Sequence, residues 1–220
     1  MLEVLYEDNH LIAVNKKSGD IVQGDKTGDT PLSDFVKAYI KKKYNKPGEV
    51  FLGTIHRLDR PTSGIVLYAR TSKALSRMNE QFRNKEVQKT YWAVVGNAPP
   101  NEYGTLENYL QKNQKQNKSY VTKGAEGKHS ILNYKLLKKL DNFYHLEIKP
   151  KTGRHHQIRV QLANIGCIIK GDLKYGAKRS NKDASIHLLA QKLDFIHPVK
   201  KETITITAYP PQDNIWFACS

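Results

Sequence analysis

The sequence of 220 residues contains only two cysteines, Cys167 and Cys219. They form no Cys-x-x-Cys pair and show no other spacing typical of a zinc site. Two isolated thiols are what a reduced cytosolic setting ordinarily contains. We therefore expect a cytoplasmic protein without a metal centre.

Long apolar runs are also absent, since no stretch approaches the roughly 20 residues that a helix needs to cross a bilayer. The first twenty residues contain Glu3, Glu7 and Asp8 and lack the pattern of a signal peptide. The chain has no internal repeat and no clear linker, and its length suits one domain, because domains usually hold roughly 100–200 residues. These absences predict a single folded domain over residues 1–220 that does not associate with membranes.

Acidic residues are scarce relative to basic ones. The chain has 36 Lys and Arg against 21 Asp and Glu, which gives a formal net charge of +15. A charge of this sign and size attracts polyanions, which are either nucleic acid or an acidic membrane surface. Without a membrane segment or an export signal, nucleic acid is the better partner.

The hydrophobic pattern predicts many strands and few helices. One helix is expected to follow Thr30, which would cap it, with an inward face of Leu32, Phe35, Val36, Tyr39 and Ile40. Two more are expected over residues 72–85 and from about His155 to Gly166. Strands are expected at 2–6, 11–15, 50–55, 65–70, 90–95, 104–110, 129–138, 143–149 and 203–208. Because strands and helices do not alternate regularly, the pattern favours an α+β fold with a mostly antiparallel sheet.

One segment between these strands stays open. Residues 111–128 are rich in Lys, Asn and Gln and are interpreted as an exposed hairpin or loop. Such a segment would either contact RNA or be a solvated, mobile tip, and its composition does not decide between the two.

The strongest local pattern is the run His56–Leu67, in which Asp59 stands between Arg57 and Arg60 before the turn residues Pro61–Gly64. Nearby positive charge favours the ionised form of a carboxyl group. An ionised aspartate held in place can act as a nucleophile. The alternative is a surface ion pair in a loop, which is the ordinary meaning of an isolated Arg-x-Asp.

The run His56–Asp59 followed by Thr62–Gly64 resembles the signature of the RluA-type pseudouridine synthases, which isomerise uridine to pseudouridine within RNA. Two further blocks of that family follow in the right order, Lys89–Tyr91 and Thr152–Val160. The first and last blocks are specific, whereas Lys-x-Tyr is weak alone. The resemblance extends from about residue 2 to about residue 210.

The resemblance implies an α+β fold with a mixed, mostly antiparallel β-sheet, flanking helices and a central catalytic cleft. It implies an isomerase that acts on ribosomal or transfer RNA and uses no cofactor or metal. We expect a monomer without the separate N-terminal RNA-binding domain that some family members carry, because the catalytic pattern begins at residue 2.

The resemblance also implies roles for single residues. Asp59 would be the nucleophile, Arg154 would pair with it, and the ring of Tyr91 would lie against the target uracil. The alternatives are a phosphate contact for Arg154 and a packing role for Tyr91.

Four further residues are expected to bind RNA. Arg57 would fill the gap left by the flipped uridine or contact a phosphate, since a guanidinium suits both. His155, His156 and Arg159 lie at or just inside a helix start, where backbone N–H groups favour anions. A packing role is equally compatible with at least one of the two histidines.

Two other functions compete with this one. A hydrolase could use Asp59 to cleave a glycosidic bond, although glycosidases usually need a second carboxyl group, and none stands out in the three blocks. A non-catalytic RNA-binding protein could retain the fold, although all three expected catalytic residues are present.

Overall fold

The computed structural model describes residues 2–24, 28–124 and 126–219. The chain divides into two compact units, which we call unit 1 and unit 2. Unit 1 comprises Met1–Gln88 and Ala190–Pro210, and unit 2 comprises Lys89–Leu189 and Pro211–Ser220. The single domain expected over residues 1–220 stays a prediction. Within the described part of the chain, no helix is both long and apolar enough to cross a bilayer.

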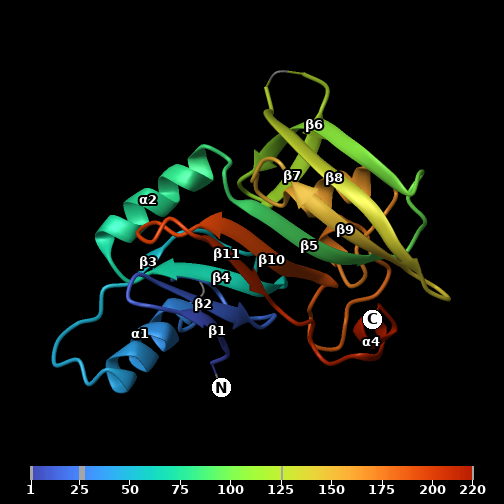
Figure 1. The fold of residues 1–220 in the computed structure, drawn as a ribbon. Helices are drawn as coiled ribbons and strands as arrows, with labels where there is room; N and C mark the ends of the chain where they lie inside the picture. The colour runs from blue at the N-terminus through green and yellow to red at the C-terminus, as the bar shows by residue number, and fades with distance from the viewer. Residues whose placement is uncertain (1, 25–27, 125, 220) are drawn as a thin grey trace. The chain divides into compact units, whose positions relative to one another are not determined.

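Unit 1 contains a small sheet and two helices (Figure 1). Strand β4 lies between β2 and β10 in this sheet, β1 pairs with β2, β3 with β4, and β11 with β10. The elements are β1 (Val4–Glu7), β2 (Leu11–Lys16), α1 (Leu32–Lys43), β3 (Gly53–Thr54), β4 (Ser63–Ala69), α2 (Ser72–Arg83), β10 (Leu188–Ile196, in unit 1 from Ala190) and β11 (Thr203–Thr207).

The core of unit 1 lies on both faces of this sheet because β2 and β4 are apolar at successive positions. One face packs with Ala74 and Met78 of α2, and the opposite face packs with Val36 and Ile40 of α1. Side chains alternate between the two faces of a strand. Continuous apolar runs such as Leu11–Val14 therefore supply both layers at once. This is why these strands lack the alternation of a half-exposed sheet.

Helix α1 lies where the sequence predicts a helix, but two details of the prediction are wrong. Pro31, not Thr30, is the N-cap, and it makes no side-chain cap hydrogen bond. The N–H groups of Leu32 and Ser33 instead donate to the backbone carbonyls of Ile21 and Val22. Phe35 was expected inside and is 54% exposed, because the buried stripe follows residues four apart and leaves Phe35 on its flank.

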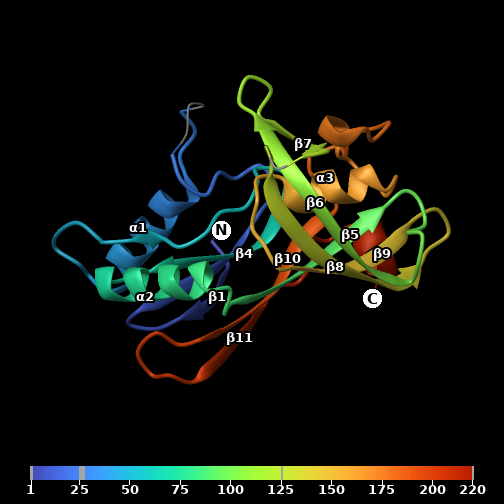
Figure 2. The same ribbon diagram turned by 90° about the horizontal axis from the view of Figure 1, so that it is seen from above.

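Unit 2 contains five strands in the order β5–β9–β8–β6–β7, with antiparallel pairing throughout (Figure 2). The expected hairpin after residue 111 is confirmed, because β7 pairs with the end of β6. The elements are β5 (Gln88–Val95, in unit 2 from Lys89), β6 (Tyr103–Asn113), β7 (Lys118–Thr122), β8 (Lys128–Lys139), β9 (Tyr144–Pro150), α3 (Gln157–Asn164), the short 3-10 helix η1 (Leu173–Tyr175) and α4 (Asn214–Cys219).

The sheet of unit 2 is covered by one helix in each of two apolar clusters. Helix α3 contributes Ile158 and Leu162 to a cluster with Ile148 of β9. Helix α4 contributes Trp216 to a second cluster with Val94 of β5. Antiparallel pairing and few helices confirm the α+β class with a mostly antiparallel sheet.

Gly64, the second residue of β4, lies at a place that only glycine tolerates. Its φ of +111° is in the left-handed region, and a Cβ there would lie 2.3 Å from the backbone oxygen of Ala190. Gly19 has a similar φ of +92°, but a Cβ there would meet nothing within 4 Å. Replacing either glycine by a residue with a Cβ strains its backbone. At Gly64 alone, the added Cβ would also clash with the backbone of Ala190.

We therefore expect Gly64→Ala to lower the free energy of unfolding by more than about 3 kcal/mol, because strain and overpacking add. Gly19→Ala should cost about 1–2 kcal/mol, which is the strain alone. Urea denaturation followed by circular dichroism measures both. Equal losses in the two variants would show that the approach of Gly64 to Ala190 does not constrain the fold.

Candidate active site

In unit 1 the loop that carries Asp59 is fixed through its backbone. The Thr62 N–H donates to the Asp59 carbonyl at 3.0 Å and closes a turn. The Gly19 N–H donates to the Arg60 carbonyl at 2.9 Å. The Ser18 hydroxyl donates to the Pro61 carbonyl at 3.2 Å. The segment after β2 therefore binds the residues that follow Asp59.

Lys16, the last residue of β2, adds a buried charge to this arrangement. Its side chain is only 1% exposed. Its Nζ donates to the carbonyls of Lys17 at 2.8 Å, Arg60 at 3.0 Å and Thr62 at 2.8 Å. Burial lowers the pKa of Lys16 to about 8, while the carboxylates of Asp20 and Asp59 act to raise it. A buried ammonium is stable only when its donors are used, so Lys16 and this loop require each other.

His56 holds the other end of the same loop. Its Nε2 accepts a hydrogen bond from the Leu67 N–H of β4 at 3.1 Å. Its ring stacks on Phe82 of α2, with ring centroids 5.3 Å apart and planes 19° apart. An accepting Nε2 is unprotonated, so the contact with Leu67 requires the neutral imidazole. His56 thus positions the run that leads to Asp59.

The two arginines beside Asp59 differ in their surroundings. Arg57 is exposed, which suits the expected contact with RNA. Arg60 forms an ion pair with Asp29, with 2.7 Å between Nη2 and Oδ2, and both side chains are about half exposed. Exposed pairs of this kind contribute little to stability, and hydrogen bonds to backbone carbonyls carry more of the loop's order.

In unit 2, Tyr91 lies on β5 opposite Ile148 of β9. It is partly buried and packs against the apolar cluster of α3. Lys89 stands two residues earlier on the same strand, so its side chain leaves the same face of the sheet as Tyr91. Burial lowers the pKa of Lys89, and its Nζ would lie 3.7 Å from a Cβ placed on Gly153. The Lys-x-Tyr pattern therefore brings an amine to the loop before Arg154.

Arg154 is exposed, and its loop is held by Gln157. The Arg154 N–H donates to Gln157 Oε1 at 3.0 Å, and the Thr152 hydroxyl donates to the same oxygen at 2.7 Å. The Gln157 Nε2 donates to the Ile131 carbonyl at 3.0 Å. The guanidinium Nε donates to the His129 carbonyl at 3.1 Å. The backbone of Arg154 is thus anchored to β8 while its side chain reaches solvent.

The two histidines stack on each other, with ring centroids 3.8 Å apart. His155 is half-buried and its Nδ1 lies 2.9 Å from the Ser119 hydroxyl of β7. His156 is buried, is the N-cap of α3 with a φ of 54°, and places Nδ1 2.9 Å from the Tyr175 hydroxyl. Burial and, to a smaller extent, the charge of Arg159 lower the pKa of His156 to about 2. These contacts favour the packing alternative for His156.

Arg159 is buried inside α3, at 4% exposure. Its Nε and Nη2 donate to the two carboxylate oxygens of Asp172 at 2.7 and 2.8 Å. A buried bidentate pair of this kind fixes geometry, and breaking one side leaves an uncompensated charge. The expected phosphate contact of Arg159 stays a prediction, and its observed contact joins α3 to the segment before η1.

Sequence reasoning missed the roles of Lys16, Lys89, Gln157 and Asp172, although Lys89 and Gln157 stand inside the blocks that carry the resemblance. Among the described residues there is no group of three or more His, Cys, Asp or Glu side chains that could hold a metal ion. The expected site residues fall in both units: Arg57 and Asp59 in unit 1, and Tyr91, Arg154, His155, His156 and Arg159 in unit 2. The pairing of Arg154 with Asp59 stays a prediction.

Comparison with known proteins gives relatives along almost the whole chain. A ribosomal large subunit pseudouridine synthase C of Buchnera aphidicola subsp. Baizongia pistaciae is 35% identical over 213 residues, which cover 93% of this chain and 66% of that protein. A tRNA pseudouridine synthase C of Haemophilus influenzae is 35% identical over 227 residues, which cover 94% of this chain and 92% of that protein. The chain thus spans about two thirds of the first relative and nearly all of the second.

Solved structures agree on the fold. The human RNA pseudouridylate synthase domain containing 4 matches 99% of this chain and 91% of its own, with a TM-score of 0.81 and 22% identity. The human RNA pseudouridylate synthase domain containing 1 matches 100% of this chain and 87% of its own, with a TM-score of 0.75 and 23% identity. The family model described as RNA pseudouridylate synthase matches residues 10–164, which include Asp59, Tyr91 and Arg154. The chain therefore belongs to the RNA pseudouridylate synthase family.

Proposed function

We propose that this protein is an RNA pseudouridine synthase that isomerises specific uridines of ribosomal or transfer RNA. The observation that carries the proposal is the 35% identity over 92% of the length of a tRNA pseudouridine synthase C. The ribosomal relative supports the wider choice of substrate. We further propose that it acts as a monomer in the cytoplasm, in agreement with its two thiols and its charge of +15.

The reaction breaks the bond between ribose C1′ and uracil N1, turns the base and forms a bond between C1′ and C5. The proton lost from C5 is balanced by a proton gained at N1, so no electrons and no water enter. The enzyme must supply one nucleophile, retain the freed uracil and control two proton transfers. No metal ion or organic cofactor is needed for these steps.

Asp59 is the proposed nucleophile, because its loop is held to the protein by the carbonyls of the three residues that follow it. Three first steps suit a carboxylate: attack on C1′, attack on C6, or removal of a ribose proton. Arg154 is the proposed partner that keeps Asp59 ionised and oriented, by resemblance to the family. Its anchored backbone and exposed guanidinium support this role.

Tyr91 is proposed to lie against the target uracil, since flipped bases are usually held by stacking on aromatic or apolar side chains. Its hydroxyl is a candidate for the proton at C5. We propose Arg57 and His155 as RNA contacts, because they are the more accessible of the four expected residues. His156 and Arg159 are proposed to hold the loop of His155 through Tyr175 and Asp172.

One measurement separates this proposal from its rivals. The purified protein is incubated with transcripts of large-subunit ribosomal RNA and of transfer RNA, and pseudouridine and free uracil are then quantified. We expect pseudouridine at a defined position and no uracil. Free uracil would indicate a glycosidic hydrolase, and binding without either product would indicate an RNA-binding protein that does no chemistry.

Asp59→Asn should lower the rate of pseudouridine formation at least about a thousandfold, since loss of a nucleophile removes a step that no other group supplies. RNA affinity should stay within a few-fold of wild type, because phosphate contacts dominate it. Asp29→Asn, on the exposed partner of Arg60, is the matched control and should retain the wild-type rate. If an Asp59→Asn protein that is free of deamidation still forms pseudouridine, Asp59 is not the nucleophile.

Tyr91→Leu should weaken RNA binding by roughly 5- to 100-fold, the range typical of losing one base–aromatic stack. Tyr91→Phe should retain the affinity because it keeps the ring, and its single-turnover rate then reports on the hydroxyl. Tyr144→Leu is the control, since Tyr144 packs against the same apolar cluster. If both Tyr91 variants bind and react like wild type, Tyr91 is a packing residue.

Lys16→Met should lower the free energy of unfolding by roughly 2–4 kcal/mol, because buried carbonyls lose a charged donor. At permissive temperature we expect kcat to fall more than RNA affinity, since the Asp59 loop loses its order while phosphate contacts remain. The neighbouring exposed Lys17→Met is the control and should change stability by less than about 0.5 kcal/mol. Equal kcat values in folded Lys16→Met and Lys17→Met would show that Lys16 does not position Asp59.

A further inference from the structure

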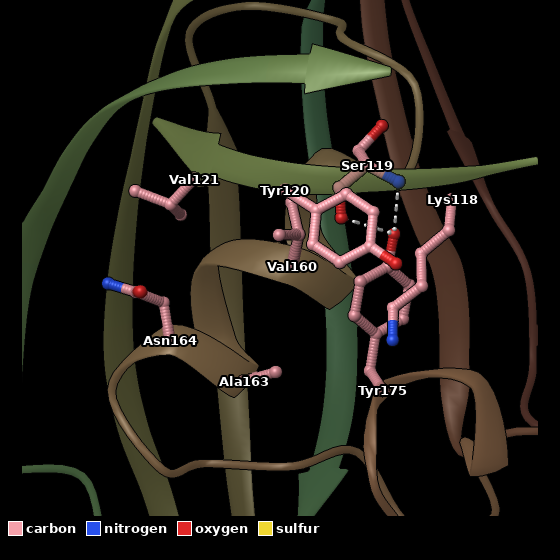
Figure 3. A pocket seen from close by; sticks show the side chains of 8 residues that line it. All are labelled: Lys118, Ser119, Tyr120, Val121, Val160, Ala163, Asn164 and Tyr175. Carbon is pink, nitrogen blue, oxygen red and sulfur yellow. Dashed lines mark hydrogen bonds between the residues drawn. The ribbon is translucent and has the colours of Figure 1, made fainter. Parts of the chain in front are cut away.

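A cavity of about 270 Å³ opens in unit 2 where β7, α3 and η1 meet (Figure 3). Val160 and Ala163 of α3 and Val121 of β7 give it apolar walls. The rings of Tyr120 and Tyr175 and the side chain of Lys118 complete one side. Neither Tyr91 nor Arg154 lines it, so it is separate from the proposed catalytic residues of this unit.

The cavity lies beside the last strand in the order of its unit, and this strand offers backbone groups to it. The Ser119 N–H donates to the Tyr175 hydroxyl at 2.9 Å, and this hydroxyl donates to the Ser119 carbonyl at 3.2 Å. The peptide groups of Ser119 thus point to the open edge of β7. In an antiparallel strand every second residue points the same way, so the N–H and C=O of Val121 face that edge beside the cavity.

The aromatic wall is preorganised by its contacts. The Tyr175 hydroxyl also lies 2.9 Å from His156 Nδ1, and the ring of Tyr175 is only 8% exposed. Tyr120, by contrast, is 40% exposed. The Tyr175 ring is therefore a fixed part of the wall, which reduces the entropy that binding must overcome. The exposed Tyr120 ring is accessible to a ligand.

Positive charge surrounds this aromatic pair. The Lys118 Nζ lies 5.3 Å from the centroid of the Tyr120 ring and 5.1 Å from that of Tyr175. The Lys174 Nζ donates to the Asn117 carbonyl at 3.1 Å, next to Lys118 in the hairpin. None of the residues that line the cavity is acidic. The surroundings therefore attract an anionic chain, while the cavity itself accepts an apolar, planar group.

We propose that this cavity binds a nucleobase of the bound RNA other than the target uridine. The proposal rests on the proposed function. The volume lies just below the roughly 300 Å³ at which pockets for drug-sized ligands begin, so it suits a single base. Tyr120 stacks on the base, the Val121 peptide groups meet its polar edge, and Lys118 contacts an adjoining phosphate. A phosphate alone would not fill apolar walls, and a peptide strand would not explain the lysines.

The test compares two fluorescein-labelled oligomers of equal length, a single-stranded oligouridine and one of abasic nucleotides, by fluorescence anisotropy. Tyr120→Ala removes the exposed ring, and Ala163→Leu fills the cavity without changing charge. Both should weaken binding of the oligouridine by roughly 5- to 100-fold and leave the abasic oligomer unchanged. Lys118→Met should weaken both oligomers, because a phosphate contact does not depend on the base. Tyr103→Ala, on an exposed tyrosine of β6, should affect neither.

The proposal is overturned if Tyr120→Ala and Ala163→Leu bind the oligouridine like Tyr103→Ala, an outcome that would leave the edge of β7 to a peptide partner. It is also overturned if both variants weaken the two oligomers equally, since the site would then serve phosphate. Should Ala163→Leu fail to fold by circular dichroism, the exposed Tyr120→Ala decides. Pseudouridine formation by the wild-type protein is measured separately, so that a failure of the proposed function is distinguishable from a failure of this cavity.

Discussion

The buried ammonium of Lys16 is the interaction on which the order of the Asp59 loop depends. A fully buried lysine is unfavourable unless its donors find acceptors, and Lys16 finds carbonyls of Lys17, Arg60 and Thr62. These carbonyls in turn lie in a turn that water would otherwise solvate. Neither the charge nor the loop is stable in this form without the other. The backbone of the turn that begins at Asp59 is thereby held by hydrogen bonds from a buried charge.

In unit 2 a loop of expected site residues is ordered by different interactions. Its loop around His155 is held by the bidentate pair of Arg159 with Asp172 and by the hydroxyl of Tyr175. The hydrogen bonds between Tyr175 and Ser119 extend this network to the hairpin strand β7. Because all of these groups are buried, a change in one is transmitted to the others as strain. The proposed base cavity and the loop of His155 therefore share one rigid support.

The sequence predicted the elements well because their periods are strong, and it failed where tertiary contacts decide. Strands β1, β2 and β4 and helix α1 follow from apolar runs, whereas β10 was not predicted. The exposure of Phe35 depends on which row of the helix meets the sheet. The expectation that charged residues face solvent hides Lys16 and Arg159, since only the folded chain shows their acceptors. From its position at a helix start, His156 was expected to bind an anion. In the structure its backbone is left-handed and its ring contacts the Tyr175 hydroxyl.

The distribution of charge explains how a chain of net charge +15 remains both ordered and free to bind RNA. Acids that matter for the fold are taken up by buried or nearly buried cations, as in Asp172 with Arg159 and Glu7 with Arg70. The surplus lysines lie largely on the surface, where salt screens them far more than it screens buried pairs. Raising the salt concentration should therefore release RNA while the loops of Asp59 and His155 keep their geometry. Affinity and positioning thus rest on separate sets of charges in the same chain.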